Sequence, residues 1–309
     1  MSASTVGDVG GDVRYVEVQG AHDVHASLRM GSGALHLGGG AEHLMKARFS
    51  YVHQDWRPEV LYEVREGTGH LDVRQPDLLG TLLHSPDYHW DLQLSDSVPL
   101  DVALKLGSGQ ADLDLRTLQI RKLRAALGSG RCRADLRGDH SHLQHVSVKS
   151  GSGLNELVFD GLYEQLEEVA IANASGENDL RLTGGFPELR RVKLNSASGR
   201  IDLQLNGTMP QLDSTTINTA SSDVDVVLQL VTAGDLSLIV NCVSGVTCVR
   251  YQRSTPISAR FTAVTGRVEA PGFRHEGGVW RNSACETAEA CINVIVSSVS
   301  GKLILQPLD

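Results

Sequence analysis

Aromatic residues, basic clusters and long apolar runs are all scarce in this 309-residue sequence. Phe, Trp and Tyr make up 5% of it, which is little for a groove that stacks sugar rings. The net charge is −9, with no Lys/Arg cluster, and this argues against nucleic acid or an anionic membrane as a partner. No apolar run approaches the roughly 20 residues that cross a bilayer. The start, MSASTVGDVG, also lacks the basic and apolar regions of a signal peptide, so the sequence predicts no transmembrane segment, while an export signal that has been removed stays open.

The five cysteines lack the C-x-x-C spacing of zinc ribbons and thioredoxin-like sites. Cys242 and Cys248 are six residues apart, as are Cys285 and Cys291, whereas Cys132 stands alone. Two interpretations stay open: five reduced thiols in a cytosolic protein, or two local disulfides in an exported one. The paired spacing points to the cell envelope, but the sequence leaves the compartment undecided.

A short pattern, a small residue followed by serine and glycine, returns along the chain at nearly constant spacing. Rows of sequence that start at this pattern are 21 or 23 residues long, with five consecutive rows of 23. Self-similarity at a fixed period in this range is the mark of a solenoid, in which each repeat packs only against its neighbours. The rows start at Gly107, Gly128, Gly151, Ala174, Ala197, Ala220, Val243 and Val264, and a final fragment starts at Val299.

Within each row, apolar residues alternate with a period of two, as half-buried strands require. Stacked rows place Leu182 over Leu205 and Leu180 over Leu203, which predicts apolar core columns. The recurring glycines supply the positive φ that a repeated corner needs, and the repeated serines are structural because a catalytic serine would not recur seven times. Asn155 and Asn178 are expected to form an inward amide ladder. The predicted fold class is all-β: a single-stranded parallel β-solenoid with coils of about 23 residues.

The period is less regular towards both ends. We expect a flexible N-terminus over residues 1–12, irregular coils with insertions over 13–106, where MGSGALHLGG and EGTGHLDVRQ both suggest the corner followed by a strand, and regular coils over 107–263. The last row runs 35 residues, so residues 264–309 are expected to form a coil and a capping loop that covers an open strand edge. No linker divides these segments, which we therefore expect to form one continuous domain.

Two stretches, VHASLRMGSGALHLGGGAEHLMKARFSY and VPLDVALKLGSGQADLDLRTLQIRKLRAALGSG, resemble the toast-rack domain of LiaF-like bacterial proteins. From residue 128 onward, the rows resemble adhesin-like bacterial β-solenoids built on the same Ser-Gly turn. The resemblance implies a non-enzymatic role in the cell envelope, in sensing stress, in adhesion or in scaffolding. Members of the toast-rack family often carry transmembrane helices, whereas this sequence has no segment suited to one.

The period also predicts an outward column of carboxylates with neighbours about 4.8 Å apart. Like charges placed opposite each other across strands repel, so the column could bind Ca²⁺ or a basic partner. The alternative is neutralisation by Arg181, Lys193 and Arg200, which we favour because the spacing matches no calcium repeat. The members of this acidic column are Glu156, Asp179, Asp202 and Asp225.

Other candidate sites are weaker. GDHSHLQH gathers His140, His142 and His145 near Asp139, but it falls in a return loop and histidines are scattered elsewhere, so no metal site is predicted. Asp112 with Asp114, or the acidic column, could supply the paired carboxylates of a glycosidase. No nucleophile elbow, P-loop or dinucleotide motif occurs, so we expect no catalytic residue and no cofactor.

The function expected from the sequence is a non-enzymatic binding, sensing or scaffolding protein of the bacterial envelope. Its partner would be a protein or an envelope polymer, and the chain could form a homo-oligomer. The alternative is a glycan-processing β-helix enzyme, which a groove with convergent carboxylates would favour.

Overall fold

The computed structural model of the protein describes residues 10–52, 54–76 and 88–308. The chain divides into two compact units, Met1–Asp135 and Leu136–Asp309, which we call unit 1 and unit 2. Both are built of β-strands, and the all-β parallel solenoid predicted from the repeat is confirmed. Residues 1–9 of the expected flexible N-terminus lie outside the described residues.

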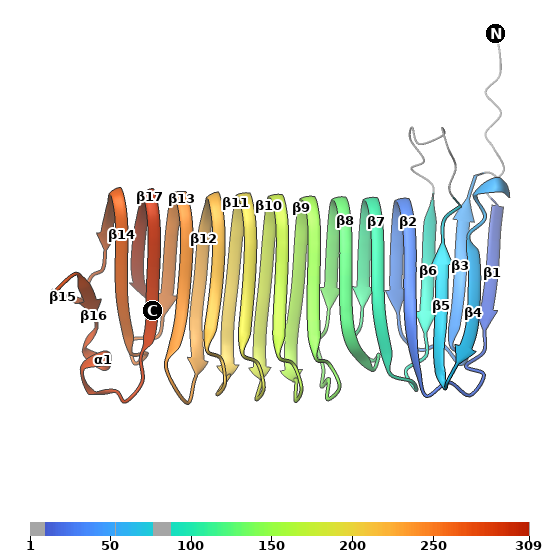
Figure 1. The fold of residues 1–309 in the computed structure, drawn as a ribbon, viewed down its shortest axis with the longest axis horizontal. Helices are drawn as coiled ribbons and strands as arrows, with labels where there is room; N and C mark the ends of the chain where they lie inside the picture. The colour runs from blue at the N-terminus through green and yellow to red at the C-terminus, as the bar shows by residue number, and fades with distance from the viewer. Residues whose placement is uncertain (1–9, 53, 77–87, 309) are drawn as a thin grey trace, which may run out of the picture. The chain divides into compact units, whose positions relative to one another are not determined.

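Unit 2 consists mainly of long parallel strands, one for each coil. The first five stack in chain order (Figure 1), and each strand after the first is displaced by 23 residues from the one before it, so that Leu180 pairs with Leu203. The predicted 23-residue register is thus confirmed. These strands are β9 (His145–Leu162), β10 (Glu168–Gly185), β11 (Arg191–Thr208), β12 (Ser214–Val231) and β13 (Leu236–Tyr251).

Each coil turns a corner in the middle of its strand. In β10, Val169 and Ile171 are buried before the corner and Leu180 and Leu182 after it, so the inward side changes from odd to even positions. Gly176 makes this change possible with φ +116°, and a Cβ at this residue would overlap the carbonyl oxygen of the preceding coil's corner glycine. Only glycine fits both constraints, which explains why the pattern recurs.

The core of unit 2 is a set of apolar columns along the stack of coils. Leu182 and Leu205 are fully buried and pair in register, as do Leu180 and Leu203. Inside the corner, the Asn155 Nδ2 atom donates a hydrogen bond of 2.8 Å to the Asn178 Oδ1 atom, which confirms the predicted inward amide ladder. This bond satisfies polar groups that are buried between the coils of β9 and β10.

The C-terminal strands do not stack in chain order. β17 (Ile292–Pro307) lies between β13 and β14 (Ile257–Glu269), pairing in parallel with both (Figure 1). The row at Val299, rather than the row at Val264, therefore follows the row at Val243. The segment between β14 and β17 holds the hairpin β15 (Arg274–Glu276) and β16 (Val279–Arg281) and the short helix α1 (Ser283–Thr287). β16 pairs with β14 at Ser258 and Ala259 and covers part of its edge.

Unit 1 uses the same coil with more irregular surroundings. β2 (Asp23–Gly38), β7 (Leu100–Asp114) and β8 (Ile120–Asp135) run parallel, and Ser32–Gly33 pairs with Ser108–Gly109 at the corner. The other edge of β2 pairs with two short strands, one on each side of its corner. The remaining elements are β1 (Gly10–Val16), β3 (Met45–Tyr51), the 3₁₀ helix η1 (Gln54–Trp56), β4 (Glu59–Arg65), β5 (Thr68–Arg74) and β6 (His89–Leu94).

One expectation for unit 1 is wrong. The stretch EGTGHLDVRQ does not begin with a solenoid corner, because Glu66 and Gly67 form the two-residue turn of the antiparallel hairpin β4–β5. Both residues have positive φ, +52° and +82°, which is the geometry that tight hairpins prefer. By contrast, MGSGALHLGG contains a true corner at Ser32–Gly33, with φ +133° at the glycine.

Candidate functional site

The acidic column lies on the outer face of unit 2, after the corner of each coil. Asp179 pairs in register with Glu156 on one side and Asp202 on the other, and Asp202 pairs with Asp225. Alternation along the strand keeps these carboxylates outward while their neighbours fill the core. The structure therefore brings together all four predicted residues in consecutive coils.

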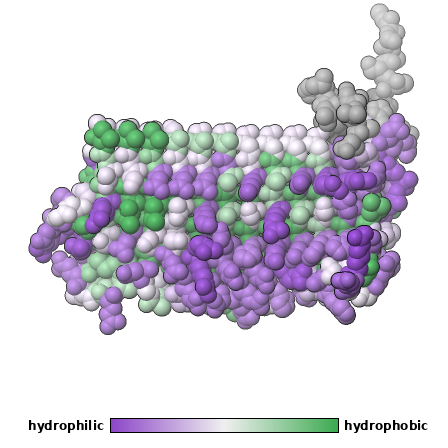
Figure 2. Space-filling model, viewed as in Figure 1, coloured by the Kyte–Doolittle hydropathy of each residue, from purple (hydrophilic) through white to green (hydrophobic). Residues whose placement is uncertain are grey.

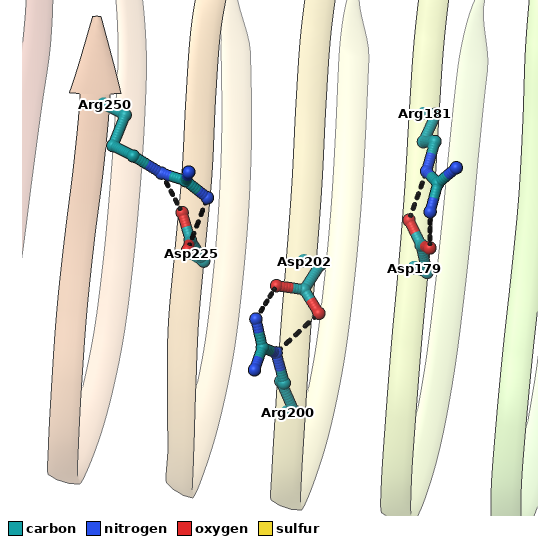
Figure 3. A network of polar contacts seen from close by, with 6 residues as sticks. All are labelled: Asp179, Arg181, Arg200, Asp202, Asp225 and Arg250. Atoms are coloured by element: carbon teal, nitrogen blue, oxygen red, sulfur yellow. Dashed lines mark hydrogen bonds and ion pairs between the residues drawn. The ribbon is translucent and has the colours of Figure 1, made fainter. Parts of the chain in front are cut away.

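Three members of the column form ion pairs with arginines (Figure 3). The Asp179 carboxylate accepts hydrogen bonds of 3.1 and 2.5 Å from Arg181, two residues later on the same strand. Asp202 accepts bonds of 2.7 and 2.9 Å from Arg200, two residues earlier. Residues two apart on a strand share a face, which is why these pairs form locally. All of these contacts are bidentate, the strongest geometry for this kind of pair.

The third pair crosses between coils. Arg250 of β13 donates hydrogen bonds of 3.0 and 2.6 Å to Asp225 of β12. The expected partner Lys193 lies elsewhere, 3.0 Å from Glu168. Sequence reasoning thus found two of the neutralising arginines and missed Arg250, although it lies two positions beyond the column residue of the next coil. We call the three aspartates with Arg181, Arg200 and Arg250 the ionic strip.

The electrostatics of the ionic strip follow from these contacts. The hydrogen bonds that Arg181 donates to Asp179 raise the pKa of Arg181, and those that Arg200 donates to Asp202 raise the pKa of Arg200. Both guanidiniums therefore stay charged, and the repulsion expected within the acidic column is offset by cations of the chain itself. Across the described residues, no group of three His, Cys, Asp or Glu side chains is arranged to hold a metal ion.

A second outward feature runs along unit 2 just before the corner. Asn218 Nδ2 donates to Asn195 Oδ1 at 2.8 Å, and Asn241 Nδ2 donates to Asn218 Oδ1 at 2.9 Å. This exposed amide ladder forms one wall of a groove of about 710 Å³, and Ala197, Ala220, Val243 and Val299 line the other wall. The groove was not predicted, although the asparagines recur every 23 residues and Ala or Val stands two positions after each.

The cysteines divide into a bonded pair and three thiols. Cys285 and Cys291 form a disulfide with a Cα–Cα distance of 5.9 Å in the segment before β17. Cys242 and Cys248 are both free thiols on opposite sides of the corner, where Cys242 pairs in register with Thr219 and Cys248 pairs with Asp225 of the acidic column. Burial raises the pKa of the Cys132 thiol to about 12. The redox state in the cell stays a prediction for thiol titration.

The remaining sequence candidates are not assembled into a site. His140 is buried and stacks on Tyr163, with ring centroids 5.7 Å apart, whereas His142 is exposed in the same loop. Asp112 is exposed, and Arg116 hydrogen-bonds to Asp114 and lowers the pKa of that carboxyl. A glycosidase general acid needs a raised pKa, so the Asp114 environment works against this role.

Repeated parallel coils, glycine corners and a patterned outer face define the chain as a parallel β-solenoid protein. Residues 6–158 match the family model described as the N-terminal domain of toast_rack, DUF2154. The resemblance to the toast-rack domain that was predicted from the Gly-x-Gly turns is confirmed for this segment. A comparison with curated protein sequences found no match. No helix in the described part of the chain could span a membrane.

Several solved structures share similarity over nearly the whole chain. A "putative cell adhesion protein" from Clostridium sporogenes is 18% identical, with coverage of 97% of this chain and 100% of that one and a TM-score of 0.33. A "putative adhesin" from Bacteroides fragilis is 7% identical, with 97% coverage of both chains and a TM-score of 0.40. A "putative lipid binding protein" from Parabacteroides distasonis is 12% identical, with 98% coverage of both and a TM-score of 0.39. Scores at this level carry no argument about function.

Proposed function

We propose that the protein is a non-enzymatic, adhesin-like binding module of the bacterial cell envelope, and that the ionic strip of unit 2 contacts an envelope polymer. The observation that carries this proposal is the repetition of one bidentate carboxylate–guanidinium pair in consecutive coils. A surface that repeats along a rigid stack suits a partner that also repeats. The acidic column predicted from the sequence then acts as part of a mixed-charge surface rather than as a cation site.

The chemistry of the pairs supports contact with hydroxyl and carbonyl groups. A guanidinium carries five N–H donors, and each bidentate pair uses two of them. The aspartate also fixes the direction of the arginine, so less side-chain entropy is lost when a ligand binds. Each contact would be weak alone, but several contacts along one polymer chain raise the overall affinity.

Co-sedimentation of the full chain with purified peptidoglycan sacculi tests this proposal. We expect wild-type protein to sediment with the sacculi and the triple variant Arg181→Gln, Arg200→Gln, Arg250→Gln to lose most of that binding. The matched control removes three paired arginines from unit 1, as Arg29→Gln, Arg74→Gln, Arg116→Gln, which changes the net charge equally.

The control decides how the result is interpreted. Retained binding in the unit 1 variant would locate the contact on the ionic strip. Equal loss in both variants would reduce the effect to net charge and contradict the proposed surface. Wild-type protein that stays in the supernatant would contradict a wall polymer as the partner.

A further inference from the structure

The groove of unit 2 borders a ridge of small apolar side chains at the corner of each coil. We call this the corner ridge; it consists of Ala174, Ala197, Ala220, Val243, Val299 and Val264. The valines are 52%, 50% and 80% exposed in that order. Figure 2 shows hydrophobic surface, coloured green, along the upper edge over β13, β17 and β14. The insertion of β17 between its neighbours is what brings these valines into one patch.

Neither the groove nor the corner ridge contains a charged residue. This is unusual on a chain with a net charge of −9, for which most surfaces of two copies would repel each other. Charged pairs of unit 2 lie to either side of this surface: beyond the corner in the ionic strip, and before it where Arg191 and Lys193 pair with Glu168. An uncharged surface on an acidic protein is the part that a second copy can approach without electrostatic cost.

The amide ladder lowers the cost of covering the groove. Asn195, Asn218 and Asn241 already bond to one another at 2.8 and 2.9 Å, so a dry partner would not leave their bonded groups without a hydrogen bond. A polar ligand, by contrast, would have to compete with these bonds. The groove therefore favours an apolar occupant over a hydroxylated one.

The occupant must also match the spacing of the walls. Within each wall, equivalent residues of neighbouring coils are about 4.8 Å apart. The two walls are separated by two residues along each strand, which is roughly 7 Å. The corner ridge has the same repeat and side chains of one or three carbons, so the ridge of another copy fits between the two ladders. Identical ladders that interdigitate in this way form dry, tightly packed contacts.

We propose that two copies of this chain associate through unit 2, with the corner ridge of each copy in the groove of the other. The contact is isologous, as in most homodimers, because ridge and groove lie side by side on one surface. The groove spans only a few coils, so we expect the interface to bury less than about 1,200 Å² of total surface, which is small for a specific interface. We therefore expect a weak, concentration-dependent dimer.

Sedimentation velocity on the full chain from about 1 µM to about 1 mM tests the proposal. The wild-type mass should rise from 33.3 kDa towards twice that value as concentration increases. The double variant Val243→Asp, Val299→Asp should stay monomeric over the whole range. Its matched control, Val231→Asp with Val13→Asp, also replaces two exposed valines but lies outside the ridge, and it should associate like wild type.

Thiol labelling gives a second measurement. Cys242 lines the groove and Cys248 lies beyond the corner, and both thiols are free and half-buried. Labelling of Cys242 should slow as concentration rises, whereas that of Cys248 should not. A constant mass of 33.3 kDa in wild type would overturn the proposal. So would association that persists in the ridge variant, or that is lost equally in the control.

Discussion

Units 1 and 2 build parallel coils from the same corner but complete them differently. In unit 2 every coil is one long strand, and aliphatic columns such as Leu180 with Leu203 fill the core. In unit 1 the coil of β2 continues into short strands that pair antiparallel with others, around the large buried side chains of Trp90, Phe49 and Tyr88. A constant repeat length lets whole strands pair in register, whereas irregular length requires hairpins to complete the pairing.

The largest expected effect comes from breaking a column of unit 2. Leu205→Asp places a carboxylate in a fully buried position between Leu182 and Leu228, with no cation nearby in the column. We expect the free energy of unfolding to fall by several kcal/mol, at least about 4. Leu162→Asp, at a 41% exposed position in β9, is the matched control and should change it by less than about 0.5 kcal/mol. Urea denaturation measures both, and similar midpoints for the two variants would contradict the buried column.

The corner gives the next largest effect. Gly176→Ala adds a Cβ that overlaps the preceding coil and requires a φ of +116° that alanine rarely adopts. We expect a loss of about 1–3 kcal/mol from the backbone alone, with the overlap adding to it. Gly234→Ala, where a Cβ would meet nothing within 4 Å, should be nearly neutral. If thermal denaturation shows equal melting temperatures for the two variants, the corner does not depend on glycine.

Much of the regular part of the fold could be predicted because the same signal recurs in each row. The Ser-Gly corner and the alternation around Leu180 and Leu203 together determine period, register and inward face. The order of the last strands could not be predicted, since VTG at Val264 and VSG at Val299 carry the same corner signature. Which of them pairs with β13 depends on packing against the whole preceding coil.

The candidate site was predicted in position but not in its contacts. The acidic column follows from the period, whereas its neutralisation depends on which side each arginine reaches. Arg200 turns towards Asp202 on its own strand, but Arg250 reaches Asp225 on the neighbouring one. Likewise, the asparagines of the groove were visible at 23-residue spacing, yet only the structure shows that they face outward beside the corner ridge.

Alkaline pH should lower the stability of unit 1 more than that of unit 2, and this effect is smaller than the two above. Burial raises the pKa of Tyr88 to about 12, and burial also raises the pKa of Cys132 to about 12. Because the folded state holds each proton more tightly than the unfolded state, each group stabilises the fold. This contribution is fully present below the pKa of the unfolded chain, about 10 for tyrosine and 9 for cysteine, and is lost as pH rises towards 12. Both groups lie in unit 1, so we expect unit 1 to lose stability between about pH 9 and 12.

The variant Tyr88→Phe with Cys132→Ala should be less stable at neutral pH but show a flatter decline in alkaline solution. The fluorescence of the buried Trp90 and denaturant midpoints between pH 8 and 11.5 follow this change. Tyr15→Phe, at an exposed position, is the control and should keep the wild-type profile. A decline of equal steepness in the double variant would assign the alkaline transition to other groups.

The smallest expected effect is in the ionic strip, where the pairs lie at the surface of unit 2. Asp202 and Arg200 are 30% and 58% exposed, so a double-mutant cycle with Asp202→Asn and Arg200→Gln should give only a small coupling free energy. Because arginines already offset the acidic column, millimolar Ca²⁺ should leave the melting temperature unchanged. A cation site would instead add stability by mass action, since the unfolded chain lacks the array. A rise in melting temperature with Ca²⁺ that Asp179→Asn with Asp202→Asn abolishes would show that the column holds a cation despite its arginines. Moderate NaCl should weaken the measured coupling by screening, which distinguishes a surface pair from a buried one.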